Sequence, residues 1–433
     1  MGPSGGEADP AVVAVIGSTF PIPPEAGTPR PFQLLKRIAA RTAVHCLAVV
    51  PQSPEEWERF REHPSLRDVF ASTTAFHRRT EVSPFAKLLT LLTARPLFDQ
   101  RFRDPAALAG AHARARELVG AHGPAVFYCW ERDTLQYVPR ELWRSTVWDL
   151  VDAPVLATER RLAVDETLGS WERFKLRAAL VPLRRFERRA LRRVGRAVLN
   201  SSADIAIVSA RVPGAPIANV IDGGDADYFS AENAPGATEA PADLLFFGNL
   251  GFPPNADAAL HLVRDIMPLV WRARPDARAI VVGPDPPEGL RALQDGRRVI
   301  VTGFVPDVRP YLARATVIVS PLRFGTGMKN KLQAGLAMGK AMVASRVTCE
   351  GFDRLEPGIH ALVADGAQEI ARASLALLDD PARRRALGAA GRLLIRTHYG
   401  WDAAATVLWE NLRHLAPAAP ASAGTSADAY RST

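Results

Sequence analysis

Residues 317–345, VIVSPLRFGTGMKNKLQAGLAMGKAMVAS, decide the fold of this 433-residue chain. They predict a short buried strand, a loop that contains Gly325 and Gly327, a helix whose first turn contains Lys329, and a second buried strand after Gly339. A strand that is joined to another strand through a helix is a βαβ unit, and such units build parallel sheets.

The same alternation continues on both sides of this segment. In the second half, the apolar runs LLFFGN, AIVVG and VIVTG precede it, and helix-like stretches separate them. The first half opens with AVVAVIG at 11–17, and further strand candidates lie at 44–50, 125–130, 146–151, 197–200 and 218–221. Both halves therefore predict an α/β domain with a parallel sheet, and the two sheets should face each other across a cleft.

Composition places the domain boundaries. A stretch rich in Gly, Ala, Pro and acidic residues separates the halves, and both ends of the chain are polar and low in complexity. We expect a disordered tail at 1–10, a first Rossmann-like domain at 11–221, a linker at 222–242, a second Rossmann-like domain at 243–398, a terminal helix at 399–415 that packs back on the first domain, and a disordered tail at 416–433.

Other features narrow the class of protein. Hydrophobic residues make up 47% of the chain and charged residues 23%, which is typical of a globular protein. Three scattered cysteines predict neither a disulfide framework nor a zinc site. There is no 18-residue apolar run, and Glu7 and Asp9 stand where a signal peptide has basic residues. We expect a cytoplasmic protein, with a peripheral place on the inner face of the membrane as the alternative.

The net charge of +8 favours anionic partners such as nucleotide diphosphates or acidic lipids. The loop at Gly325 and Gly327 would allow backbone N–H groups to approach an anion, and Lys329 and Lys331 would add positive charge at the start of a helix. The alternative is an ordinary βαβ turn with solvated lysines.

The residues from Ser320 to Ser345 resemble the donor-binding signature of retaining GT-B glycosyltransferases of glycosyltransferase family 4, P-x-R-x-G-x-G-x-K-x-x-E-A-M-A-x-G. The resemblance extends in order through FFGNLGFPPNADA (246–258), AIVVGPDP (279–286), VIVTGFVPDVRPYL (299–312), CEGFD (349–353) and HYGWDAAA (398–405), and more loosely through FPIPPEAGTPR (20–30), NSSADIAIV (200–208) and VIDGGDADYF (220–229). Through the PPN at 253–255, the chain is most similar to sugar transferases of bacterial exopolysaccharide systems.

The resemblance implies a GT-B fold and a retaining, metal-independent transfer of a sugar. The donor would be a UDP-, GDP- or dTDP-sugar, and the acceptor would be a hydroxyl of a saccharide, a lipid-linked saccharide or a secondary metabolite. No cofactor beyond the donor and no nucleic-acid partner are expected.

The resemblance also assigns roles to single residues. Catalysis would involve Lys331, Arg323 and Asp152. Gly27 and Arg30 would close over the donor from the first domain, Asn249 would approach it from the second, and Phe304 and Val305 would meet the base. Gly325, Thr326, Gly327, Lys329 and Lys331 would hold the diphosphate, and Gln333 would take the ribose.

The chain departs from the family pattern at its two donor-site glutamates, whose places we assign to Gly325 and Gln333. This departure leaves two interpretations open: an enzyme with altered donor contacts, and a non-catalytic GT-B protein that scaffolds a polysaccharide or glycosylation pathway. A different GT-B activity, such as sugar-nucleotide epimerisation, is a third.

The strongest basic cluster is VPLRRFERRALRRVGR at 181–196. Its apolar residues follow the period of a helix, so it predicts a helix with one basic face. One interpretation is a peripheral contact with an anionic membrane through the residues from Arg184 to Arg196. The other is a surface helix whose arginines are simply solvated, as charge runs on helices often are.

Overall fold

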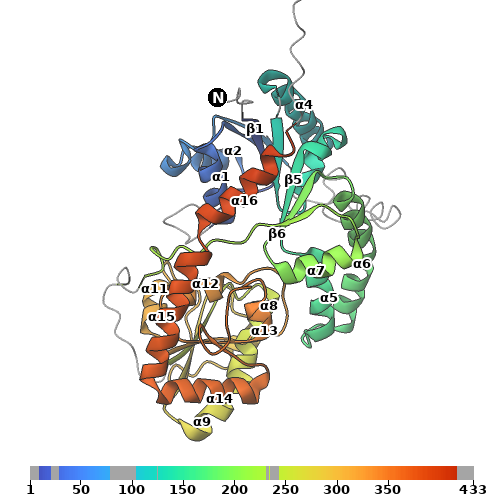
Figure 1. Cartoon of the computed structure of the whole chain (residues 1–433). Helices are drawn as coiled ribbons and strands as arrows, with labels where there is room; N and C mark the ends of the chain where they lie inside the picture. The colour runs from blue at the N-terminus through green and yellow to red at the C-terminus, as the bar shows by residue number, and fades with distance from the viewer. Residues whose placement is uncertain are drawn as a thin grey trace, which may run out of the picture.

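The computed structural model describes residues 9–20, 29–78, 104–123, 125–230, 234 and 243–416 (Figure 1). The segments 1–8 and 417–433, which make up most of the two predicted tails, lie outside the described residues. The first sheet and its helices form the upper lobe of Figure 1, and the second sheet forms the lower lobe.

The first lobe is built on a seven-stranded parallel sheet in the order β3-β2-β1-β4-β5-β6-β7. Its strands are β1 (Ala11–Ile16), β2 (Val44–Val50), β3 (Ser72–His77), β4 (Ala125–Trp130), β5 (Thr146–Val151), β6 (Arg196–Leu199) and β7 (Ile217–Asn219). The order reverses between β1 and β4, which is the switch point of a doubly wound fold.

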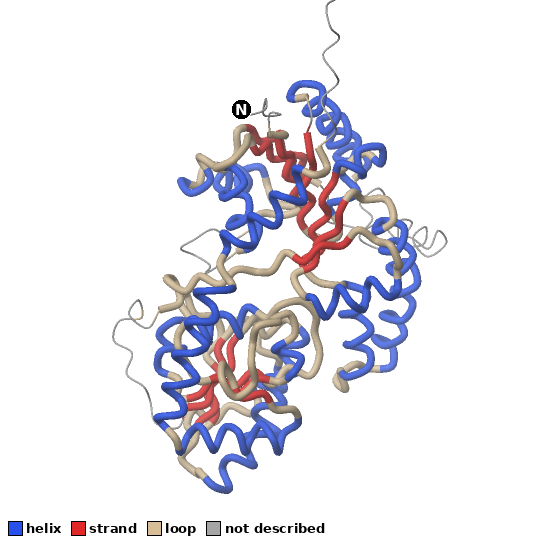
Figure 2. The backbone as a smooth tube through the Cα atoms, in the orientation of Figure 1, coloured by secondary structure: helices blue, strands red, loops and turns tan. Residues whose placement is uncertain are grey.

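The second lobe has a six-stranded parallel sheet in the order β10-β9-β8-β11-β12-β13. Its strands are β8 (Asp243–Phe247), β9 (Arg278–Val282), β10 (Val299–Val301), β11 (Val317–Ser320), β12 (Met342–Ala344) and β13 (Leu362–Val363). Figure 2 shows the two sheets as separate groups of red strands. The predicted fold class, two Rossmann-like parallel-sheet domains, is confirmed.

Helices cover both sheets. Those of the first lobe are α1 (Arg30–Ala39), α2 (Pro54–Arg61), α4 (Pro105–His122), α5 (Pro154–Val164), α6 (Ser170–Leu191) and α7 (Ser202–Arg211). Those that follow β8 are α8 (Pro253–His261), α9 (Met267–Ala273), α10 (Glu288–Arg291), α11 (Arg309–Arg314), α12 (Asn330–Ala337), α13 (Arg346–Cys349), α14 (Gly366–Asp379), α15 (Pro381–His398) and α16 (Trp401–Arg413). Short 3-10 turns occupy Pro64–Leu66, Thr134–Tyr137 and Arg140–Ser145, and a π-helical turn occupies Leu262–Ile266.

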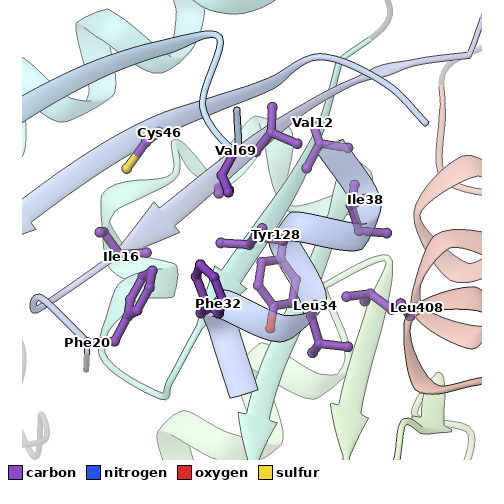
Figure 3. Close-up of a cluster of buried hydrophobic side chains, with 14 of the residues drawn as sticks. Val12, Ile16, Phe20, Phe32, Leu34, Ile38, Cys46, Val69, Tyr128 and Leu408 are labelled. Atoms are coloured by element: carbon purple, nitrogen blue, oxygen red, sulfur yellow. The ribbon is translucent and has the colours of Figure 1, made fainter. Parts of the chain in front are cut away.

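The last helix belongs to the core of the first lobe. Figure 3 shows Leu408 of α16 beside Leu34 and Ile38 of α1, and Figure 1 shows α16 in red crossing the upper lobe next to α1. Six residues of α16 are buried in the cluster that also holds Val12, Ile16 and Tyr128: Trp401, Ala404, Ala405, Leu408, Trp409 and Leu412. Apolar burial therefore ties the C-terminal end of the chain to the first sheet.

The chain passes between the lobes twice, and the two passages touch. The N–H of Gly224 donates to the carbonyl of Tyr399 over 2.6 Å. A Cβ atom on Gly223 would lie 2.4 Å from the ring of Trp401, so only glycine fits there.

A buried network of charged side chains binds this passage to the first lobe. The guanidinium of Arg30 donates to Asp149 over 2.9 Å and to Asp222 over 2.5 Å, and it also donates to the carbonyls of Val220 and Ile221. The hydroxyl group of Tyr128 donates to Oδ2 of Asp149 over 2.6 Å. Burial of this kind is tolerated because every charge has a partner.

Replacing Arg30 with methionine tests this network. The variant leaves the carboxylates of Asp149 and Asp222 buried without their cation, so we expect the free energy of unfolding to fall by about 3–5 kcal/mol. Urea unfolding followed by tryptophan fluorescence measures the change. As a control, Arg61→Met removes an exposed ion pair with Glu58 and should leave the midpoint unchanged. Equal midpoints for the two variants would contradict the assignment.

Candidate active site

A cavity of about 380 Å³ lies where the two lobes meet. The first lobe contributes Asp152, and the passage between the lobes contributes Phe229. The second lobe contributes the loop after β8, the start of α8, and the loop and helix that follow β11: Phe247, Gly248, Asn249, Phe252, Pro254, Asn255, Leu322, Gly325, Thr326, Met328, Lys329, Asn330, Lys331 and Ala334. These loops follow the carboxyl ends of parallel strands, where such folds bind ligands.

The loop between β11 and α12 needs its two glycines for conformation and for space. Gly325 has φ +144° and Gly327 has φ +69°, a region that L side chains rarely adopt. A Cβ atom on Gly327 would also lie 2.8 Å from Oδ1 of Asn200 and 3.0 Å from Cβ of Asp152. The first lobe therefore approaches the backbone of this loop directly.

Lys331 lies in the first turn of α12 and contacts the cavity. Its ammonium group is 2.8 Å from Oδ1 of Asn255 and 5.7 Å from the centre of the Phe246 ring. The amide of Asn255 in turn donates to the carbonyl of Asn249 over 2.8 Å, which fixes its orientation. Burial, with a smaller contribution from the charge of Lys329, lowers the pKa of Lys331 to about 7.

Lys329 immediately precedes α12 and is almost fully buried. Its ammonium group donates to the carbonyl of Gly327, two residues earlier, so the side chain folds back on its own loop. Burial lowers its pKa, while the carboxylates of Glu350, Asp204 and Asp152 act in the opposite direction. The two lysines thus bring positive charge to the start of a helix, where an anion is also favoured by the helix dipole.

A strained turn directs Asp152 into the cavity. Val151 at the end of β5 has φ +66°, which is unusual for a β-branched residue, and the N–H of Asp152 donates to the carbonyl of Leu150 over 2.8 Å. Burial raises the pKa of Asp152. At the end of the neighbouring strand β4, Glu131 has φ +71°, and burial raises its pKa to about 7.

The structure brings together only part of the predicted site. Over the described residues, the lining includes Asp152, Asn249, Gly325, Thr326, Lys329 and Lys331 of the predicted set. It does not include Arg30, Phe304, Val305, Gly327, Arg323 or Gln333. Gly27 lies outside the described residues.

Two of these residues lie elsewhere in the second lobe. The guanidinium of Arg323 pairs with the carboxylate of Asp257, with Nε 2.9 Å from Oδ2. Phe304 follows β10 and is 75% exposed, so its ring is open to a ligand that would extend beyond the cavity.

Arg30 is not placed to close over a donor. Its guanidinium is buried between Asp149 and Asp222, and its role is to hold the passage between the lobes. Sequence reasoning missed this because both partners are more than 100 residues away along the chain.

The position of Gln333 is also corrected. Its side chain is only 3% exposed, and its amide donates to the carbonyl of Asp222 over 2.6 Å, so it faces the passage between the lobes. Ala334 lines the cavity instead. In the motif, the glutamate stands five residues before the last glycine, and five residues before Gly339 is Ala334. The helical side that faces the cavity therefore carries no carboxylate at this position.

Four residues of the site escaped sequence reasoning: Asn255, Asn200, Asp204 and Arg160. Asn255 lay within the quoted PPN, and Asn200 and Asp204 lay within NSSADIAIV, but the motifs alone gave them no function. In the structure, Asn200, Asp204 and Arg160 all bond to the backbone of the glycine loop from the first lobe.

Comparison with known proteins agrees with this architecture. Residues 241–380 match the family model described as Glycosyl transferases group 1. No curated protein matches the chain.

Solved structures resemble nearly the whole chain. HepE from Anabaena, in complex with UDP and glucose, has a TM-score of 0.61 at 14% identity, over 93% of this chain and 99% of that one. Sucrose-phosphate synthase from Thermosynechococcus elongatus has a TM-score of 0.64 at 16% identity, over 94% and 99%. WaaG, a glycosyltransferase involved in lipopolysaccharide biosynthesis, has 0.58 at 14%, over 92% and 99%. The chain thus has the GT-B fold, and its second lobe carries a match to the group 1 glycosyltransferase model.

Proposed function

We propose that the protein transfers a sugar from a nucleotide diphosphate donor to a hydroxyl acceptor, and that it belongs to the retaining enzymes of glycosyltransferase family 4. The observation that carries this proposal is the cavity between the lobes, in which the glycine loop, Lys331 and the start of α12 converge. The group 1 match covers this part of the chain, and HepE is a protein of similar fold that binds UDP.

In this proposal, the diphosphate lies against Lys331 and the first turn of α12. Asn255 holds the ammonium group of Lys331 in the cavity, and Lys329 adds a second positive charge. An anion in the cavity would favour the protonated form of Lys331 and would be stabilised by it. We propose that these charges neutralise the leaving diphosphate without a metal ion.

The acceptor would enter from the side of Asp152, the residue that the first lobe contributes to the lining. The bond between the sugar C1 and the diphosphate oxygen would break, and a bond from C1 to the acceptor oxygen would form on the same face. The acceptor proton would pass to the leaving phosphate. Phe304 and Val305, beyond the lining, would meet the base, because the loop after β10 lies at the same edge of the sheet.

The second candidate is a non-catalytic protein that scaffolds a polysaccharide or glycosylation pathway. Gly325 and Ala334 favour it, because neither supplies the carboxylate that the family pattern places beside the donor. A screen of UDP-, GDP- and dTDP-sugars for release of the free nucleotide diphosphate separates the two candidates. Release with any donor supports the enzyme, whereas nucleotide binding without release supports the scaffold.

The low pKa of Lys331 predicts a pH signature for nucleotide binding. In the free protein the pKa is about 7, so Lys331 is mostly neutral at pH 8. A bound diphosphate raises the pKa, and the site then takes up a proton. We expect the affinity for UDP, GDP or dTDP to fall as the pH rises from 7 to 9, and the heat of binding at pH 8 to depend on the ionisation enthalpy of the buffer.

Titration calorimetry in HEPES and in Tris measures this proton uptake. Lys331→Arg keeps a charge that does not titrate, so it should bind without taking up a proton. Lys331→Met should lose about 1.5–3 kcal/mol of binding free energy. Identical heats for the wild type in both buffers would contradict the assigned role of Lys331.

Two adjacent substitutions test which side of α12 faces the donor. Ala334→Glu places a carboxylate on the lining, where it can accept hydrogen bonds from ribose hydroxyls, so we expect nucleotide affinity to rise about tenfold. Gln333→Glu removes the N–H donor to Asp222 and buries a negative charge, so we expect a lower melting temperature and no gain in affinity. A gain for Gln333→Glu alone would reverse the assignment.

The basic segment of α6 supports a proposal about location. Leu183, Ala190 and Leu191 of this helix and Val194 just after it are buried, while Arg184 pairs with Glu159 on α5. The outer face exposes Trp171 by 66% and Phe174 by 59%, with their rings stacked 5.4 Å apart. We propose that this apolar and basic face contacts an anionic membrane surface peripherally. Among the described helices, none is long and apolar enough to span a bilayer.

Flotation with lipid vesicles tests this contact. We expect the wild type to float with vesicles that contain phosphatidylglycerol and to stay in solution with phosphatidylcholine alone. Changing Trp171 and Phe174 to serine should abolish flotation, because the apolar contact is lost. Leu393→Ser, on α15, removes a side chain that is also 66% exposed and should have no effect. Equal flotation of all three proteins would contradict the proposal.

A further inference from the structure

The glycine loop between β11 and α12 contacts both the cavity and the first lobe. Gly325, Thr326, Met328 and Lys329 line the cavity, whereas Gly327 does not. Side chains of the first lobe accept from the backbone of this loop: the N–H of Gly327 donates to Oδ2 of Asp204 over 2.6 Å, and the N–H of Met328, a residue of the lining, donates to Oδ1 of Asn200 over 3.1 Å. The backbone of the loop is therefore bonded to the first lobe.

We infer that Asp204 and Asn200 are positioning residues that fix the backbone of the loop so that its cavity-lining residues form the diphosphate site. We call these two residues the clasp. The inference rests on the proposed function, and it assigns the first lobe a part in building a donor site whose lining comes almost entirely from the second.

The clasp is buried, which strengthens it. Asp204 and Asn200 are almost completely inaccessible to solvent. A hydrogen bond from a backbone N–H to a carboxylate is charge-assisted, and water does not compete with it in a buried place. The close approach of Asn200 to Gly327 leaves no space for a side chain, so the lobes meet at the loop without a gap.

The clasp is itself held from the first lobe. The amide of Asn200 donates to Oδ2 of Asp222 over 2.8 Å, and Asp222 is paired with Arg30. Arg160 on α5 lies 3.8 Å from Asp204. A chain of direct contacts thus runs from the first sheet to the glycine loop.

Arg160 adds a third bond to the loop. Its guanidinium donates to the carbonyl of Gly325 over 2.6 Å and pairs with Glu350, which follows α13 in the second lobe. Gly325 stands two residues before Gly327, which is bonded to Asp204. The turn is therefore bonded to the first lobe at both of its ends.

A role for Asp204 within its own helix does not account for its position. Ser201 caps α7 through its hydroxyl, which accepts from the N–H of Asp204. The carboxylate of Asp204 is directed to the other lobe instead. If the lobes separate, the loop loses these bonds to its backbone, so donor affinity should depend on contact between the lobes.

Asp204→Asn tests the clasp with little change of shape. We expect faster hydrogen exchange at the amides of Gly327 and Met328 in the free protein, and an affinity for UDP about tenfold lower, with melting temperature as a check of folding. The control is Asp353→Asn, which removes another contact between the lobes, an exposed one with Ser202. It should change neither readout.

Arg160→Gln provides a second test, since Arg160 is partly exposed and its loss is less of a threat to folding. We expect it to speed exchange in the same loop and to lower UDP affinity about threefold. Unchanged exchange in both variants would overturn the clasp. Faster exchange with unchanged UDP affinity would overturn its positioning role.

Different results would contradict the proposed function and the clasp. If the wild type binds none of UDP, GDP and dTDP, the proposed function is overturned, and the positioning role falls with it. The exchange measurement needs no nucleotide, so faster exchange in Asp204→Asn would still show that the clasp holds the loop.

Discussion

The pairing of the buried carboxylate of Asp222 with Arg30 is the constraint on which the rest of the structure depends. A carboxylate between two lobes must be neutralised and fully hydrogen-bonded, and Arg30 supplies the cation from the first lobe. Asp222 also accepts from Asn200 through its side chain and from Gln333 through its backbone carbonyl. One residue in the passage between the lobes thus joins α1, the turn between β6 and α7, and α12.

The candidate site follows from this junction. Asn200 reaches the glycine loop because Asp222 fixes its amide, and α12 keeps its orientation because Gln333 faces the passage. On the opposite side, Asp149 accepts from both Arg30 and the N–H of Val151, whose strained conformation places Asp152 in the cavity. Asp152 and the glycine loop, which line the cavity from the two lobes, are therefore tied to the same buried network.

A parallel sheet is buried on both faces, so its strands are continuous apolar runs. Because such runs are easy to find in the sequence, both sheets could be predicted. Two strands were not among the candidates. β3 is only half-buried at the edge of its sheet, and β13 has two residues, so neither shows a clear run. The glycines and lysines of the loop between β11 and α12 could be placed because the motif fixes their spacing.

Residues whose partners lie far away in the chain could not be placed in the same way. Arg30 finds Asp149 and Asp222 only after the first sheet has formed and the passage has crossed it. An error of one position on a helix turns a side chain by about 100°, which is why Gln333 faces the passage and Ala334 the cavity. Asn200 and Asp204 act on a loop more than 120 residues away.

A crystal structure with bound UDP is the most direct measurement of the central claim. The account predicts phosphate oxygens within hydrogen-bonding distance of the ammonium group of Lys331, with Gly327 and Met328 still bonded to the first lobe. A diphosphate bound away from α12, or in the cavity with the clasp broken, would contradict it.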